Sequence, residues 1–146
     1  MLHKPDGYTI FCDDIRQEVG NKASLMGVYG IELFVQQPFP VVLRMGFYIV
    51  LKEDMRAPHN NTLLRIFYPG DPDDEPSFAV EINRTGIKPP PIPETYDELT
   101  RRISGLHIVN MVTLKEPGKI KVRMLVDGEE VKLGTLSVRA PQTATP

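Results

Sequence analysis

The chain has 146 residues, a mass of 16.5 kDa and a formal net charge of −2, from 17 basic and 19 acidic side chains. Its 41% hydrophobic and 25% charged residues are typical of a globular protein. The length predicts one domain over residues 1–140, with a disordered C-terminal tail at 141–146. The charge balance argues against a dedicated nucleic-acid-binding protein, which needs a basic excess. The single cysteine, Cys12, excludes an intramolecular disulfide and a cysteine-rich zinc site.

No targeting or membrane signal stands out in the sequence. The first seven residues include His3, Lys4 and Asp6 and do not resemble a signal peptide. The longest apolar runs, such as Phe47–Leu51, are far shorter than the roughly 20 residues of a membrane-spanning helix. We therefore expect a cytoplasmic protein that does not enter a membrane. A lone cysteine fits that reducing compartment.

Alternation of apolar and polar residues dominates the N-terminal half and indicates strands. The Gly20-Asn21 pair predicts a tight hairpin turn, because both residues tolerate positive φ angles. Gly27 and Gly30 predict a bend or bulge within the strand that follows this turn. The expected strands in this half are Tyr8–Ile15, Ala23–Val35, Val41–Lys52, Thr62–Tyr68 and Phe78–Asn83.

The longest of these strands has two faces of different character. The face that we expect to be buried carries Val41, Leu43, Met45, Phe47, Ile49 and Leu51. The opposite face carries Val42, Tyr48 and Val50, which are too apolar for open solvent. We expect these three residues to form a contact surface for a protein partner or for a second copy of the chain.

The C-terminal half adds three strands and one helical pattern. Glu94–Ile103 has acidic residues early and basic residues late, which suits a short helix, with an irregular crossover as the alternative. The prolines of Lys88–Pro93 require an extended chain. Asp127-Gly128 predicts a tight hairpin, and a change of alternation at Gly134 predicts a β-bulge. The expected strands are Leu106–Leu114, Lys119–Val126 and Val131–Arg139. The whole pattern predicts an all-β, antiparallel β-sandwich of about eight strands with at most one short helix.

Three short pieces near the N-terminus carry a resemblance to a known family. They are Cys12-Asp13-Asp14-Ile15-Arg16-Gln17-Glu18, Gly20-Asn21-Lys22 and Ser24-Leu25-Met26-Gly27-Val28-Tyr29. They resemble the hairpin signature C-D-D-[IV]-R-x-E, G-x-K and [SA]-L-x-G-[VI]-Y of an uncharacterised family of small bacterial and phage-borne domains. The resemblance covers about the first thirty residues. It implies an all-β fold and an intracellular setting, and it implies no particular activity.

Acidic side chains gather in two places. Asp13 and Asp14 precede the first predicted turn, and Asp71, Asp73 and Asp74 lie between two predicted strands. If the two places adjoin, these five carboxylates could hold Ca²⁺, although their spacing is not that of a known calcium loop. Otherwise Asp13 and Asp14 pair with Arg16 and Lys22, and the second group forms a solvated turn. A metal-dependent hydrolase with Asp13 and Asp14 in one pocket is a further alternative.

No set of catalytic residues is apparent. The three histidines, His3, His59 and His107, have no second ligand at metal-binding spacing, so we expect surface or rim positions. Cys12 lies in an apolar strand and is expected to be a buried, unreactive thiol. The sequence contains no nucleophile elbow and no phosphate-binding glycine motif. We therefore expect a protein without catalytic residues and without a cofactor, apart from the calcium alternative.

Basic residues follow one face of a predicted C-terminal strand. Lys119, Lys121 and Arg123 alternate along it, with Lys115 and Lys132 nearby. Such a stripe could follow a phosphate backbone, but no aromatic residues alternate with it to stack on bases. Lysines on an exposed strand also protect it against edge pairing. We therefore expect an ordinary solvated face, and we favour an intracellular protein-binding module over a nucleic-acid-binding one.

Overall fold

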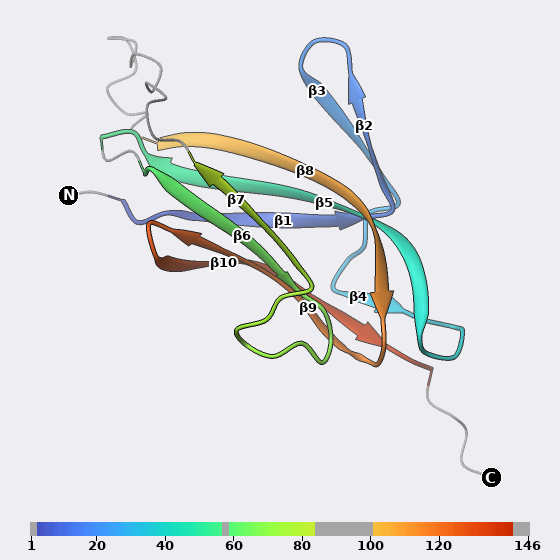
Figure 1. Ribbon diagram of the computed structural model, residues 1–146. Coiled ribbons are helices and arrows are strands. Elements are labelled where there is room, and N and C mark those ends of the chain that lie inside the picture. The colour runs from blue at the N-terminus through green and yellow to red at the C-terminus, as the bar shows by residue number, and fades with distance from the viewer. Residues whose placement is uncertain (1–2, 57–58, 84–100, 142–146) are drawn as a thin grey trace.

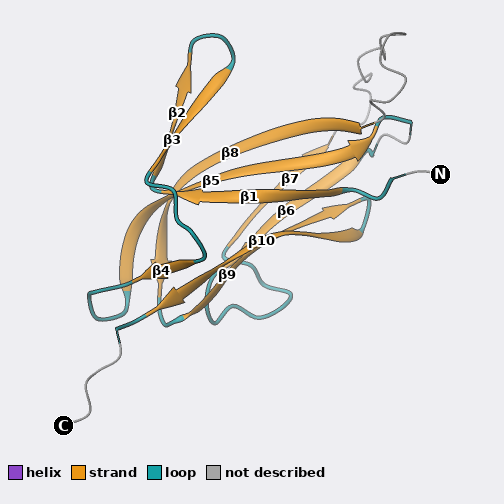
Figure 2. Ribbon diagram, turned by 180° about the vertical axis from the view of Figure 1, so that it is seen from behind, coloured by secondary structure: helices purple, strands orange, loops and turns teal. Residues whose placement is uncertain are grey.

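The computed structural model describes residues 3–56, 59–83 and 101–141, and in this part of the chain every regular element is a strand. Two sheets stack face to face, and a hairpin projects from them (Figures 1 and 2). The three-stranded sheet has the order β1 (Asp6–Cys12), β5 (Val41–Asp54) and β8 (Arg101–Leu114). Its strands are all antiparallel.

The second sheet has five strands. Their order is β4 (Glu32–Phe34), β10 (Glu129–Arg139), β9 (Gly118–Val126), β6 (Asn61–Phe67) and β7 (Phe78–Asn83). All pairs are antiparallel except β4 with β10, which is parallel. The projecting hairpin, which we call the arm, consists of β2 (Asp14–Glu18) and β3 (Lys22–Met26). None of the described residues forms a helix of the length and hydropathy that crossing a membrane would require.

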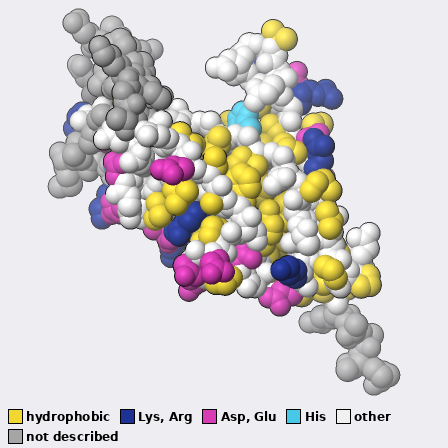
Figure 3. All heavy atoms as spheres, viewed as in Figure 1, with side chains coloured by type: hydrophobic (Ala, Val, Ile, Leu, Met, Phe, Trp, Pro, Cys, Tyr) yellow, Lys and Arg dark blue, Asp and Glu magenta, His cyan; other side chains and the backbone are white. Residues whose placement is uncertain are grey.

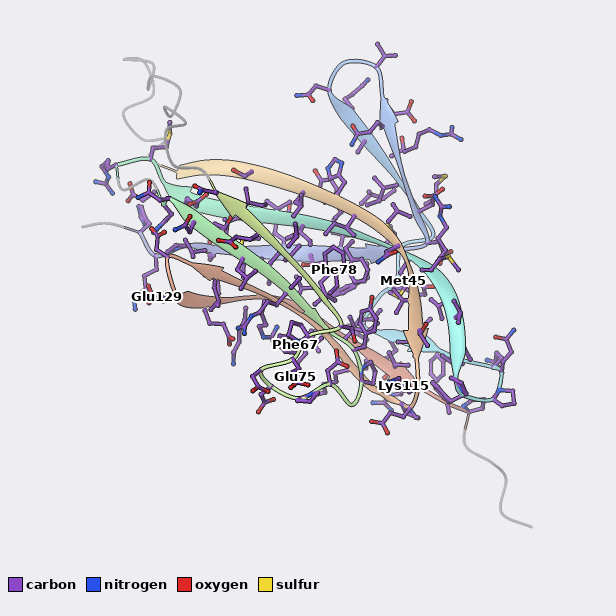
Figure 4. All side chains as sticks on the ribbon, in the orientation of Figure 1. Met45, Phe67, Glu75, Phe78, Lys115 and Glu129 are labelled. Atoms are coloured by element: carbon purple, nitrogen blue, oxygen red, sulfur yellow. The ribbon has the colours of Figure 1, made fainter. Side chains whose placement is uncertain are left out.

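The hydrophobic core lies between the two larger sheets. The expected inner face of β5 is confirmed, because Met45, Phe47 and Ile49 are almost completely buried, and Met45 lies between the layers (Figure 4). Phe47 packs edge to face against Phe11 of β1, with ring centroids 5.8 Å apart. The five-stranded sheet contributes the facing layer, whose members include Leu64, Ile66, Ile120, Val122, Met124, Leu133, Leu136 and Val138. Each such side chain contributes about 1.5–3 kcal/mol when fully buried.

The strand boundaries correct several expectations. The strand expected over Tyr8–Ile15 is interrupted at Asp13, where the chain leaves the sandwich to enter the arm. The strand expected over Ala23–Val35 is divided into β3 and β4, with the break in the segment that contains Gly27 and Gly30. The described residues therefore form ten strands, where the alternation of the sequence indicated about eight.

The helix expected over Glu94–Ile103 is wrong at its C-terminal end. Arg101, Arg102 and Ile103 belong to β8, where they pair with the last residues of β5. The rest of the expected helix, the extended segment 88–93 and the tail residues 142–146 lie outside the described residues. A residue's partner in an adjacent strand can override a weak local helical preference, because the ladder hydrogen bonds are formed by the backbone of any sequence.

The predicted turns and the β-bulge are confirmed. Gly20 and Asn21 have φ angles of 88° and 59°, and Asp127 and Gly128 have φ angles of 47° and 86°. In the pairing of β9 with β10 the register shifts between Lys132 and Gly134. In a regular strand, odd-numbered and even-numbered residues point to opposite faces. The shift lets Val131 and Leu133 share the core with Leu136 and Val138.

We expect the substitution Gly134→Ala to destabilise the fold. Gly134 has a φ of 138°, which side chains other than glycine rarely adopt, so alanine should cost about 1–3 kcal/mol. Urea denaturation measures this loss. Gly30→Ala is the matched control, because a methyl group there meets nothing within 4 Å and no positive φ is involved. Equal midpoints for the two variants would contradict a conformational role for Gly134.

Candidate functional site

The arm is the part of the structure with the least support from the core. Most side chains of β2 and β3 are exposed, and Val19 at the turn is 93% exposed. The arm rises from the end of β1 and extends away from both sheets (Figure 1). An isolated two-stranded hairpin is marginally stable in water, so contacts at its base must hold it in place.

Residues of the sequence signature form that base. The backbone N–H of Asp13 donates to the carbonyl oxygens of Met26 and Gly27, at 2.9 and 3.0 Å. The hydroxyl of Tyr29 donates to Asp13 Oδ1 at 2.7 Å. Gly27 has a φ of 66°, and a Cβ atom there would collide with the Asp13 side chain. Asp13, Gly27 and Tyr29 therefore join the two ends of the arm, which gives this part of the signature a structural role.

Asp14 connects the arm to the three-stranded sheet. Its Oδ1 atom accepts a hydrogen bond from Arg44 Nη2 of β5 at 3.0 Å and one from the N–H of Ile15 at 2.9 Å. The Arg44 hydrogen bond is the main reason that the pKa of Asp14 lies below its ordinary value. The partners that we expected for the two carboxylates, Arg16 and Lys22, are replaced by Arg44 and Tyr29.

An angle opens between the arm and the outer face of the three-stranded sheet. Here Gln17 Nε2 of the arm lies 2.6 Å from His107 Nδ1 of β8. The His107 ring stacks on Tyr48 with centroids 4.7 Å apart. Of the three histidines only His107 links two elements of this angle. This link could not be predicted from the sequence, because Gln17 is 90 positions away from His107.

Cys12 lies under the base of the arm. It is fully buried, as expected, and its thiol donates weakly to the carbonyl of Gly46 at 3.6 Å. Burial raises the pKa of this thiol above its ordinary value. A nucleophilic cysteine needs a lowered pKa and access to solvent, so this environment does not support a catalytic role.

The three residues of the expected contact surface differ in exposure. Val42 is 61% exposed and Tyr48 is half-buried beside His107. Val50 is only 3% exposed, so the expectation that it faces a partner is wrong. Val50 occupies the central strand and pairs with Tyr8 of β1, whose bulky ring lies next to it on the same face.

Strand β8 supplies a surface that the sequence analysis missed. Val109 and Met111 on its outer face are 36% and 58% exposed. Met111 pairs with Arg44 of β5, two residues along from Val42 on the same face, so the exposed apolar side chains form one patch. Hydrophobic side chains also form a band across the middle of the molecule, where β7 and β8 lie (Figure 3). One feature of the sequence could have revealed this surface: the segment from Ile103 to Leu114 contains no Asp, Glu, Lys or Arg.

The acidic residues do not converge on one ion. Asp71 Oδ2 accepts hydrogen bonds from the N–H of Tyr68 and from the N–H and hydroxyl of Ser77, at 2.7–2.8 Å. Asp73 and Asp74 are exposed in the same loop. Among the described residues no three His, Cys, Asp or Glu side chains are close enough to hold a metal ion. The arrangement in which both clusters share one calcium ion is therefore not formed.

The hydrolase alternative also lacks support from the geometry. It requires Asp13 and Asp14 to face one pocket, whereas the Asp13 carboxylate binds the Tyr29 hydroxyl and the Asp14 carboxylate binds Arg44. Two carboxylates that are each neutralised or hydrogen-bonded by a different neighbour do not form an acid–base pair.

We expect Arg44→Gln to raise the pKa of Asp14 toward its ordinary value. Because the pKa of Asp14 is lowered in the folded state, the Arg44 contact stabilises the fold at neutral pH. This stabilisation is lost as the pH falls through the folded-state pKa of Asp14. The loss of stability in Arg44→Gln should therefore be larger at pH 7 than in acid, and small because both side chains are exposed. Carboxyl NMR titration measures the pKa. Arg139→Gln removes a different surface pair, with Glu32, and should leave Asp14 unchanged.

Calcium binding stays a prediction, and thermal unfolding tests it. A ligand that binds only the folded state increases the free energy of unfolding by RT ln(1 + [L]/Kd) and therefore raises the melting midpoint. Unfolding in millimolar CaCl₂ and in chelator should therefore give different midpoints if the acidic loops bind the ion. Equal midpoints would remove the calcium hypothesis.

Comparison with known proteins agrees with the resemblance seen in the sequence. No curated protein and no solved structure gives a significant match to the chain. One family model matches residues 7–139, a range that includes the arm, both sheets and the outer face of β8. The bacterial and phage-borne setting and the hairpin signature on which the resemblance rested stay predictions. The chain belongs to DUF6941, a family of unknown function.

Proposed function

We propose that this chain is a non-enzymatic cytoplasmic protein-binding module that associates with a second copy of itself through the free edge of β8. The observation that carries this proposal is the composition of that edge. Over the twelve residues from Ile103 to Leu114 the strand has no Asp, Glu, Lys or Arg side chain, and His107 is its only titratable group. Among the described residues β8 pairs with β5 alone, so its other side is open.

The other sheet edges are protected in the ways that proteins commonly use. Strand β7 has six residues and carries Glu81, and β4 has three residues and carries Glu32. Strand β1 packs beside β10, where Thr9 lies next to Gly134. A long uncharged edge invites pairing with another strand, so natural sequences shorten it, charge it or cover it. Strand β8 has fourteen residues, and over most of its length it has none of these protections among the residues that the structure describes.

A second copy fits this edge because an antiparallel strand can pair with itself across a twofold axis. Pairing centred on Val109 brings the two Val109 side chains together and sets His107 of one copy opposite Met111 of the other. No charged side chains meet in this arrangement. The exposed apolar side chains of Val42, Val109 and Met111 then line a joint surface of six strands. The interior location of Cys12 also suits a protein that works where thiols stay reduced.

The substitution Val109→Lys tests the proposal. It places two like charges opposite each other at the twofold axis, which disfavours strand pairing. Sedimentation velocity should show a wild-type dimer, and the variant should dissociate at least about tenfold more readily, since 1.4 kcal/mol changes an equilibrium constant tenfold. Val80→Lys on β7 is the matched control, because Val80 is 37% exposed and Val109 is 36% exposed.

The outcomes separate the alternatives clearly. A wild-type dimer that persists in Val80→Lys and is lost in Val109→Lys supports the proposal. A wild-type monomer at all accessible concentrations, or equal behaviour of the two variants, overturns it. Circular dichroism of both variants verifies that each remains folded.

A further inference from the structure

A second surface lies on the far side of the molecule from β8, on the outer face of the five-stranded sheet. A hollow of 420 Å³ lies there between the β6–β7 loop and strands β9 and β10. The loop supplies one wall with Tyr68, Pro69 and Asp73. Phe67, the last residue of β6, and Glu75, within the loop, lie at the same end of the molecule (Figure 4). The opposite wall consists of basic side chains of β9 and β10.

Strand register concentrates positive charge at this hollow. Arg65 of β6 pairs with Arg123 of β9, which pairs with Lys132 of β10. Three cations therefore stand in one row across three neighbouring strands, and Lys121 and Lys119 extend the stripe along β9. Like charges directly opposite each other are unfavourable in a sheet, and the whole chain is slightly acidic. The row is thus a local exception to the charge of the molecule.

The two arginines are held by the protein itself. Arg65 Nη2 donates to Glu130 at 2.8 Å, and its guanidinium lies over the Phe67 ring at 5.4 Å. Arg123 Nη1 donates to the carbonyls of Val122 and Gly134. Arg65 Nε is buried and has no acceptor among the described residues.

The three lysines are free to bind a ligand. In the described part of the chain Lys119, Lys121 and Lys132 have no ion pair or hydrogen bond with another side chain. The carboxylates on the rim are mostly committed, because Asp71 organises its own loop and Glu130 binds Arg65. Of the acids that line the hollow, Asp73 alone has no ion pair or hydrogen bond through its side chain within the described ranges, and it stands against three such lysines.

We propose that this hollow, which we call the lysine hollow, binds a small ligand with two or more phosphate groups. Lysines at alternate positions of a strand are about 6.7 Å apart, which suits neighbouring phosphate groups of one ligand better than a single anion. A planar carboxylate is matched best by the fork of an arginine, whereas the free donors here are the compact ammonium groups of lysines.

The hollow favours a small molecule over single-stranded nucleic acid. Nucleic-acid grooves combine basic residues with aromatic rings on which bases stack. The register does bring Phe67 beside Lys121, an aromatic neighbour that the sequence analysis did not foresee, but Phe67 is only 8% exposed and offers no free ring face. A volume of 420 Å³ lies within the usual range for small-molecule sites, roughly 300–1,000 Å³.

Isothermal titration with inorganic tripolyphosphate tests this proposal on the full chain at constant ionic strength. We expect one tripolyphosphate per chain, with an affinity about tenfold lower in Lys121→Gln and in Lys132→Gln, since each charge-assisted contact contributes about 1.5 kcal/mol. Lys22→Gln is the matched control, because it removes one lysine charge on the arm, away from the hollow. All three positions are exposed, so the variants should keep the wild-type melting midpoint.

Two further ligands test whether the hollow prefers phosphate groups to carboxylates and a small molecule to nucleic acid. Citrate should bind more weakly than tripolyphosphate, and a thymidine oligonucleotide should gain no affinity with length. Absence of tripolyphosphate binding, an equal loss in Lys22→Gln, or equal binding of citrate would overturn the proposal. An oligonucleotide whose affinity rises with length would overturn it in favour of nucleic-acid binding. Because these titrations do not involve β8, their failure would leave the proposed self-association untouched.

Discussion

The apolar contact between the inner faces of the two sheets is the interaction on which the rest of the structure depends. Strand β5 contributes Met45, Phe47 and Ile49 to this contact, and the facing layer comes from strands β6, β9 and β10. Once the buried faces of the two sheets are set, alternation along each strand decides which side chains point outward. The outward side chains then form the lysine hollow on one sheet and the apolar surface along β8 on the other, on opposite sides of the same core.

The arm shows how a weak element is held without a core of its own. Its base is fixed by the Asp13–Tyr29 hydrogen bond, by the Asp14–Arg44 ion pair and by the Gln17–His107 contact. These contacts use the conspicuous carboxylates of the signature, Asp13 and Asp14, to hold the base of the arm. Acidic residues near a turn thus have a structural use that competes directly with ligand binding.

The alternation of the sequence was sufficient to predict the strands, the tight turns at Gly20-Asn21 and Asp127-Gly128, and the bulge at Gly134, because each depends on neighbouring residues. The alternation was not sufficient to predict secondary structure or burial at positions where these depend on a strand that is distant in the sequence. Ile103 was assigned to a helix from local charge order, yet it pairs with Lys52. Val50 was expected to be exposed from its alternation, yet the Tyr8 side chain of another strand lies beside it.

By itself the sequence determined that the protein is all-β, which face of the longest strand is buried, and that the acidic and basic clusters exist. Only the tertiary structure decided what those clusters contact. Arg65 and Arg123 are 58 positions apart in the chain, and register alone makes them neighbours in a row of cations. Likewise, the sequence shows that residues 103–114 contain no Asp, Glu, Lys or Arg, but only the strand order shows that they form an edge of the sheet in the described part of the chain. Local patterns determine the periodicity of a strand, whereas its neighbours are selected by the burial of the whole core.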